Sequence, residues 1–183
     1  MSGLVGDNTA RASGVIASAG GGAILSVKSL AFTGTASETG TAPTQISSLD
    51  MSFAPTESDS KLHFQAWLNI CATSASATAF YFYDVTNTAK IGAIGDTAGS
   101  RLRVSWGCDV QEYHYIANCG FGTWHEPGTT SSIDYTIFGN AHASDTLYIN
   151  RTQYNIDNTY IYNARPASVF TITEYAADAV TLT

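Results

Sequence analysis

The residues best able to support catalysis lie close together, between positions 108 and 126. They are two thiols, three carboxylates and two imidazoles: Cys108, Asp109, Glu112, His114, Cys119, His125 and Glu126. A cysteine beside a histidine can become a thiolate nucleophile, and a carboxylate such as Asp109 can orient the imidazole. No nucleophile elbow or comparable local signature accompanies these residues, and the stretch has the composition of strands and loops. We therefore expect a protein that is not an enzyme and assign it no catalytic residue.

Paired carboxylates would offer a different chemistry. Glycoside hydrolysis needs two carboxyl groups roughly 5–10 Å apart, and Glu126 could face either Glu112 or Asp109. A β-rich chain with fifteen acidic residues provides such pairs by chance, so solvated loop carboxylates are the simpler interpretation. A glycan depolymerase stays as an alternative.

Metal ligands are scattered. The four histidines, His63, His114, His125 and His142, show no zinc-ligand spacing. The loop 155–158 (Asn-Ile-Asp-Asn) lacks the alternating acidic pattern of a calcium loop. We expect no metal site and no cofactor, with one alternative left open: in a trimer, a histidine near the axis would be present three times and could bind an ion.

The glycine-rich segment 92–101 superficially resembles a phosphate cradle. Such a cradle needs a strand before it and a helix after it, whereas residues 101–106 here have the pattern of another strand. We expect a loop between strands, fixed by an ion pair between Asp96 and Arg101.

Aromatic residues form the remaining candidate surface. Five residues of the 112–128 region are the candidates for a ligand or interface surface: Tyr113, His114, Tyr115, Trp124 and His125. Tyrosine and tryptophan suit a sugar-binding surface, and they are also enriched at subunit interfaces. We favour a division of the aromatic residues between the core and a subunit interface, and keep sugar binding as the alternative.

Composition limits the partners. The 183 residues include eight basic and fifteen acidic side chains, a net charge of −7, and charged residues make up 13% of the chain. No Lys/Arg cluster is present, so binding to nucleic acid or to an anionic membrane is not expected. The odd number of cysteines, Cys71, Cys108 and Cys119, predicts reduced thiols that lie mostly in the core. No signal peptide and no membrane-inserted segment are expected.

Strand patterns must position all these side chains. Residues 61–71 alternate strictly, with Leu62 and Phe64 opening the apolar face. Further strands are predicted at 23–33, 45–53, 78–86, 101–106, 112–122, 132–139, 146–150 and 168–175, and a hairpin tip at 84–88. Eight or nine short strands joined by Gly/Pro/Asp/Ser turns predict an all-β sandwich or barrel. A jelly-roll-like antiparallel sandwich is the first choice and an immunoglobulin-like sandwich the second.

The N-terminus differs from this body. Residues 1–22 contain six glycines and two charged residues, and ordering such a segment is entropically costly. We predict an extended attachment arm over 1–22, with the β-sandwich body over 23–183. The apolar pairs Leu4-Val5 and Val15-Ile16 are its expected anchors.

Several segments resemble a broad group of bacteriophage virion proteins. Segment 91–101 (Ile-Gly-Ala-Ile-Gly-Asp-Thr-Ala-Gly-Ser-Arg) is similar to the group's IGIGDAAGSR loop, and segment 53–62 to its turn into a strand. Segments 10–16, 147–151 and 168–174 also match in order and spacing. The resemblance runs from residue 10 to about residue 177, and residues 112–128 depart from it. It implies jelly-roll-like, trimeric proteins of tail fibres or head surfaces, and it carries no catalytic motif.

These observations lead to one expected function and two alternatives. We expect a trimeric capsid decoration or cement protein of a phage virion, assembled in the host cytoplasm. Its arm would dock on the major capsid protein or on a tail component. Three arms per trimer would strengthen attachment through effective concentration. The alternatives are a tail-fibre or receptor-binding protein that recognises host-surface carbohydrate, and a glycan depolymerase.

Overall fold

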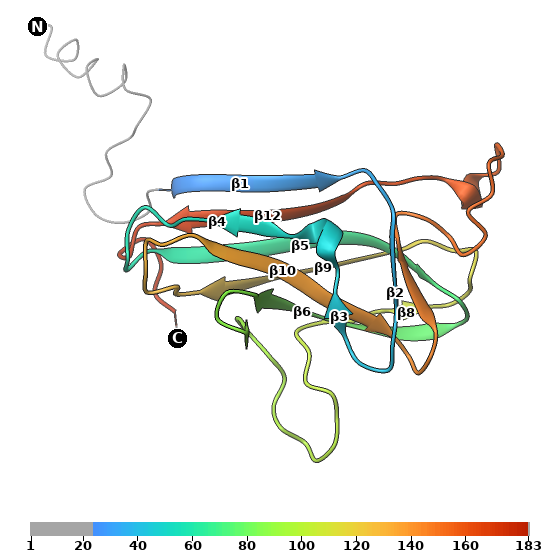
Figure 1. The fold of residues 1–183 in the computed structure, drawn as a ribbon, viewed down its shortest axis with the longest axis horizontal. Coiled ribbons are helices and arrows are strands. Elements are labelled where there is room, and N and C mark those ends of the chain that lie inside the picture. The colour runs from blue at the N-terminus through green and yellow to red at the C-terminus, as the bar shows by residue number, and fades with distance from the viewer. Residues whose placement is uncertain (1–23, 183) are drawn as a thin grey trace, which may run out of the picture.

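The computed structural model describes residues 24–182, which form a sandwich of two antiparallel β-sheets (Figure 1). The predicted all-β sandwich is confirmed. The predicted arm and its anchors Leu4, Val5, Val15 and Ile16 lie outside the described residues.

The first sheet, sheet A, contains strands from both ends of the described chain. Its strands are β1 (Ile24–Phe32), β2 (Ala36–Thr39), β5 (Lys61–Ala72), β9 (Ala117–His125), β11 (Thr146–Ile149) and β12 (Ser168–Tyr175). The central strand β5 pairs with β9 along one edge. Along its other edge, β5 pairs with β12 over its first half and with β11 near its end. Because β1 pairs with β12 and β2 with β11, these strands form two interrupted columns beside β5.

The second sheet, sheet B, is built in the same way. Its strands are β3 (Thr44–Gln45), β4 (Met51–Phe53), β6 (Ser76–Asp84), β7 (Ala89–Lys90), β8 (Asp109–Val110) and β10 (Ile133–Ala141). Strands β3 and β4 share one edge of β10, whose other edge pairs with β6. The far edge of β6 pairs with β7 and β8.

Joining the interrupted strands gives the connectivity. Numbered along the chain, the eight columns are β1/β2, β3/β4, β5, β6, β7/β8, β9, β10 and β11/β12. Sheet A then has the order 1-8-3-6 and sheet B the order 2-7-4-5. This double Greek-key arrangement is a jelly roll, as the sequence predicts.

The core lies between the two sheets. The predicted alternation in β5 is confirmed, since Leu62, Phe64, Ala66, Leu68 and Ile70 are all fully buried. Aromatic rings connect the layers: the Phe64 and Phe82 ring centroids are 5.6 Å apart, and Phe82 stacks on Phe170 at 5.6 Å. Each such side chain contributes roughly 1.5–3 kcal/mol by burial.

Several predicted strand bounds are wrong. Residues 101–106 lie in the long connection between β7 and β8, and of these residues Trp106 makes a single bridge to Phe80. Leu102 is 49% exposed, so the apolar alternation there has no sheet to bury it. The predicted strand 112–122 begins only at Ala117. The 45–53 segment is broken by the short 3-10 helix η1 (Ser47–Leu49), and β2 was not predicted.

Two predictions about turns have opposite outcomes. The hairpin at 84–88 is confirmed, because the Asp84 carboxylate accepts bonds from the Asn87 backbone N–H (2.8 Å) and side-chain amide (2.7 Å). The predicted Asp96–Arg101 ion pair is wrong, since the described residues contain no such pair. Instead, Arg103 Nε donates to the Gly95 carbonyl at 2.7 Å. This loop projects from the body in Figure 1.

Candidate functional site

The five residues predicted as a ligand or interface surface divide between opposite ends of the sandwich. Tyr113, His114 and Tyr115 lie in the turn before β9, whereas Trp124 and His125 close its far end. The nine residues of β9 separate these ends by roughly 26 Å, at about 3.3 Å per residue. A single site containing all five residues is therefore excluded.

The end of the sandwich that carries Tyr113 lies where the eighth column is interrupted, between β11 and β12. The chain leaves sheet A after β11, makes an excursion over residues 150–167 that includes the 3-10 helix η2 (Ile161–Asn163), and returns as β12. At the root of the excursion, buried Asn150 donates from Nδ2 to the carbonyls of Phe32 (2.7 Å) and Gly34 (2.9 Å). Its Oδ1 accepts a 2.6 Å bond from the Ser168 hydroxyl. This network fixes the place where the excursion leaves the sheet.

The turn before β9 is tied to the same structure. The Cys71 thiol of β5 donates to the Tyr113 carbonyl at 3.1 Å, and the Gln153 N–H donates to that oxygen at 3.3 Å. The Tyr113 and Tyr154 rings meet edge-to-face with centroids 5.3 Å apart. A hydrogen bond with Tyr113 raises the pKa of Tyr154. The two loops therefore form one surface.

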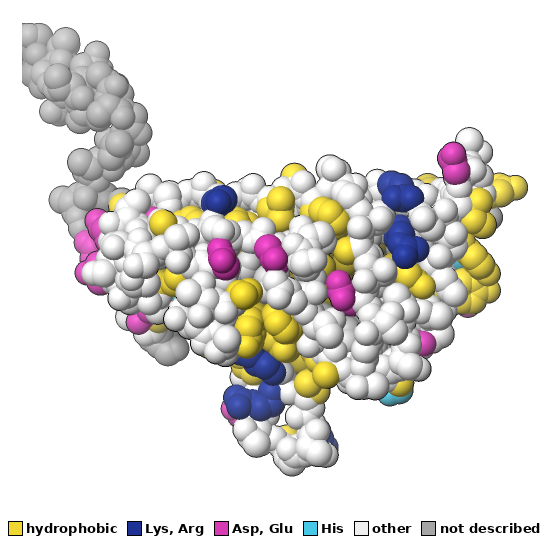
Figure 2. Space-filling model, in the orientation of Figure 1, with side chains coloured by type: hydrophobic (Ala, Val, Ile, Leu, Met, Phe, Trp, Pro, Cys, Tyr) yellow, Lys and Arg dark blue, Asp and Glu magenta, His cyan; other side chains and the backbone are white. Residues whose placement is uncertain are grey.

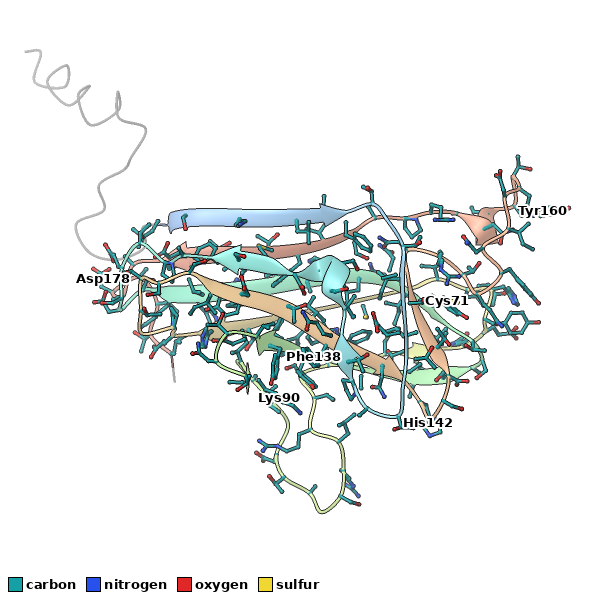
Figure 3. The ribbon with its side chains drawn as sticks, in the orientation of Figure 1. Cys71, Lys90, Phe138, His142, Tyr160 and Asp178 are labelled. Atoms are coloured by element: carbon teal, nitrogen blue, oxygen red, sulfur yellow. The ribbon has the colours of Figure 1, made fainter. Side chains whose placement is uncertain are left out.

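That surface is the main concentration of exposed apolar side chains on the described chain. Six such residues come from these two loops and define what we call the apolar tip: Tyr113, Tyr115, Tyr154, Ile156, Tyr160 and Ile161. Ile161 is 89% exposed and Tyr115 is 56% exposed. Figure 2 shows the hydrophobic side chains gathered at this end, and Figure 3 places Tyr160 at its extremity.

The apolar tip is hollowed. A depression of about 360 Å³ is lined by His114, Tyr115, Ile116, Ile161, Ala164 and Pro166. The His114 and Tyr115 ring centroids are 4.5 Å apart, and His114 Nδ1 lies 3.4 Å from Glu112 Oε2, an ion pair when the imidazole is protonated. This arrangement can bind a ligand through apolar contact with a few polar groups.

Trp124 and His125 are structural at the opposite end. Trp124 stacks on His63 with centroids 4.4 Å apart. His125 packs edge-on against Phe64 (6.1 Å) and Tyr135 (5.9 Å). Burial lowers the pKa of His125, which keeps the imidazole neutral near pH 7. Both side chains complete the packing of that end.

Among the candidate catalytic residues, Glu112 contacts His114 and Cys108 contacts Cys119, whereas other pairs that the chemistry would need are separated. Cys119 and His125 lie on the same strand, and six positions of extended chain separate them by roughly 20 Å. Glu112 and Glu126 flank opposite ends of β9, so they are not at the spacing that glycoside cleavage needs. The three cysteines are free thiols, with Cys71 and Cys119 buried and Cys108 half-buried.

Residues 24–182 were searched for side chains that could bind a metal ion and for helices that could span a membrane. No group of three or more His, Cys, Asp or Glu side chains there is arranged to hold an ion. Within the same range, no helix has the length and apolar character to cross a membrane.

Sequence reasoning missed four of the six residues of the apolar tip. Tyr154, Ile156, Tyr160 and Ile161 lie in a segment that contains no predicted strand. The available signal was the presence of four large apolar residues within eight positions of a polar loop, which no core requires.

Comparisons with known proteins do not assign this chain to a family. No protein-family model matches this chain, and no curated protein matches its sequence.

Proposed function

We propose that this protein is a structural component of a phage virion, a trimeric capsid decoration or cement protein attached by residues 1–22. The observation that carries the proposal is the jelly-roll connectivity, because this is the fold that the resemblance of the loop segments implies. The low share of charged residues, 13%, also supports it. Subunits with few charges pack together without desolvating ions.

Attachment by the arm can be tested separately from folding. We expect that a chain lacking residues 1–22 still folds and forms the same oligomer, but is lost from purified particles. The matched control is the full-length chain with Leu4, Val5, Val15 and Ile16 all changed to serine, which keeps the length and removes the anchors. Normal incorporation of both variants would exclude the arm as the attachment device.

A second function is favoured by the apolar tip: recognition of host-surface carbohydrate by a tail-fibre or receptor-binding protein. The hollow beside Tyr115 and His114 offers a flat ring and polar groups, the combination that suits sugars. Particles carrying Tyr115→Ala should adsorb to host cells at least about tenfold more weakly. Ile24→Ser, which changes an exposed residue far from the tip, is the control. Equal adsorption would remove this function.

A depolymerase is the least supported function, because Glu112 and Glu126 lie apart. If the protein cleaves host polysaccharide and the double variant Glu112→Gln/Glu126→Gln abolishes cleavage, the structural role is wrong. Absence of cleavage by the unaltered chain agrees with it.

A further inference from the structure

A second exposed aromatic lies on the outer face of sheet A, well away from the apolar tip. Trp67 is 57% exposed although it sits in the middle of the central strand β5. Its neighbours on the same face of β5 are His63, Gln65 and Asn69, which alternate with the buried core residues. An indole in this position contributes little to the core, so its exposure needs another explanation.

The indole of Trp67 lies over the neighbouring strand, above Gly120. Trp67 pairs with Gly120 and Gln65 with Gly122 in the β5–β9 register. A Cβ added to Gly120 would lie 2.5 Å from Trp67 Cε3 and 2.7 Å from the Ala66 carbonyl oxygen. The absence of a side chain at Gly120 therefore lets the ring rest on the sheet, with its other face toward solvent.

The two glycines also open a hollow beside the ring. It has a volume of about 300 Å³ and is lined by Gln65, Trp67, Gly120, Phe121 and Gly122. Such a volume is at the lower end of the range for small-molecule sites.

Hydrogen-bonding groups around the hollow are uncharged amides. Asn69 is held in place, because its Nδ2 donates to the Ala167 carbonyl at 2.7 Å and its Oδ1 accepts from Asn118 Nδ2 at 3.4 Å. Gln65 is exposed and its side chain makes no hydrogen bond within the described part of the chain. Its amide can therefore donate and accept toward a ligand.

The outward positions around Trp67 lack formal charge. The outward positions of β1, β12, β5 and β9, apart from Lys61 at one end, are Val27, Ser29, Ala31, Val169, Thr171, Thr173, Tyr175, His63, Gln65, Trp67, Asn69, Asn118, Gly120, Gly122 and Trp124. Burial lowers the pKa of His63, so this imidazole is neutral at pH 7. A charged ligand would find no partner beside the ring, because Lys61 lies at one end of this face and Arg151, which stacks over the Tyr148 ring of β11, lies at the other.

We propose that the hollow beside Trp67 binds one sugar unit of a neutral oligosaccharide. The negative face of the indole attracts the C–H groups on the apolar face of a pyranose ring, while the amide of Gln65 bonds the hydroxyls at its edge. A second copy of this chain fits less well. The centre of a subunit interface is apolar, whereas the polar Gln65 and Asn69 border Trp67 along β5 and Val169 and Ala31 alone extend its apolar surface across the next two strands. The site does not depend on the virion role proposed above.

The test uses the full chain and defined probes. We expect it to bind a member of an array of neutral homo-oligosaccharides of glucose, galactose, mannose and N-acetylglucosamine, in preference to sialylated and sulfated glycans. With the bound probe, Trp67→Ala should weaken affinity at least about tenfold, and Gln65→Ala about threefold. Leu102→Ala, which removes an exposed apolar side chain from the connection between β7 and β8, away from both hollows, should leave affinity unchanged.

A measurement on the unaltered chain tests the same site without relying on variants that could misfold. Trp67 is the most exposed of the tryptophans, so the bound probe should reduce quenching of tryptophan fluorescence by acrylamide. The proposal is overturned if no neutral glycan binds at about 1 mM, or if Trp67→Ala binds as well as the unaltered chain. It is also overturned if Tyr115→Ala alone abolishes binding. A change of oligomeric state on Trp67→Ala without glycan binding would make this face a subunit interface instead.

Discussion

Asn150 Oδ1 and the hydroxyl of Ser168 are joined by a 2.6 Å hydrogen bond across the base of the excursion that carries the apolar tip. Asn150 directly follows β11, one half of the eighth column, and Ser168 begins β12, the other half. Ser168 Oγ also accepts a 2.9 Å bond from the Asn69 N–H, so the pair connects the excursion to the central strand.

Removing the hydrogen bonds of Asn150 should lower the stability of the folded chain. Asn150→Ala deletes three side-chain hydrogen bonds at a fully buried position and leaves the Phe32 and Gly34 carbonyls without their amide donor. We expect the free energy of unfolding in urea to fall by about 2–4 kcal/mol. Asn155→Ala is the matched control, because Asn155 also has a positive φ, of 47°, but is exposed. Equal losses in the two variants would mean that backbone strain, and not the buried network, decides.

Stability should depend on pH through Glu174. This carboxylate is fully buried, and burial alone would raise its pKa. Hydrogen bonds from Ser26, Ser60 and Thr56 outweigh burial and lower the pKa below its ordinary value of 4.5. A lowered pKa in the folded state means that the stabilisation is present above the unfolded value and is lost as pH falls through the folded one.

Glu174→Gln should therefore lower the free energy of unfolding at pH 7 by about 1–3 kcal/mol. Its stability should also change less between pH 5 and pH 3. Urea titrations at these pH values measure both effects, with the exposed Glu126→Gln as control. An unchanged acid dependence in Glu174→Gln would show that other groups dominate.

The cysteines should react unequally. A hydrogen bond from Cys119 lowers the pKa of Cys108 from its ordinary value of 9.0 to about 7. The same contact raises the pKa of Cys119, and burial raises that of Cys71. Iodoacetamide should alkylate Cys108 first, with a rate that is half-maximal near pH 7, as peptide mass spectrometry can follow. Cys119→Ala should move this midpoint upward. Faster alkylation of Cys71 would contradict the assignment.

Two glycines with positive φ allow the cost of backbone strain to be measured separately from the cost of steric crowding. Gly92 has φ +73°, and a Cβ there would lie 2.2 Å from Thr123 Oγ1. Gly128 has φ +67° with no atom within 4 Å of the added Cβ. Gly128→Ala should lower the unfolding free energy by about 1 kcal/mol through strain alone. Gly92→Ala should lower it by about 3 kcal/mol, because overpacking adds to strain. Thermal melts followed by circular dichroism compare the two, and equal losses would refute the crowding.

The sequence allowed the core and the fold class to be predicted because alternation is a local signal. Residues 61–71 show it without interruption, and the structure buries the predicted side of that strand. The signal fails where alternation has no partner strand, as at residues 101–106. That segment lies beside β6, whose edge is paired at both ends by β7 and β8 and in the middle at Phe80, through the backbone of Ser105 and Trp106.

The candidate site was less predictable because it depends on strand direction. Tyr113 and Trp124 lie only eleven positions apart in the sequence, but an extended strand carries them to opposite ends of the molecule. Conversely, Tyr113 and Tyr154 are forty-one positions apart and touch. That contact follows from β5, where Cys71 holds the turn before β9 and Asn69 lies at the root of the excursion. No local pattern records such a relationship.

The gap in the eighth column has a consequence for how this molecule can change over generations. The chain leaves sheet A after Ile149 and resumes pairing with the same edge of β5 at Val169. Insertions or deletions between these points leave the register of every other strand intact, because exposed loops with fixed ends tolerate changes of length. The jelly roll can thus stay constant while the segment between Asn150 and Ser168 varies in length and sequence. Substitutions and insertions in this segment can change the surface of the molecule without changing its fold.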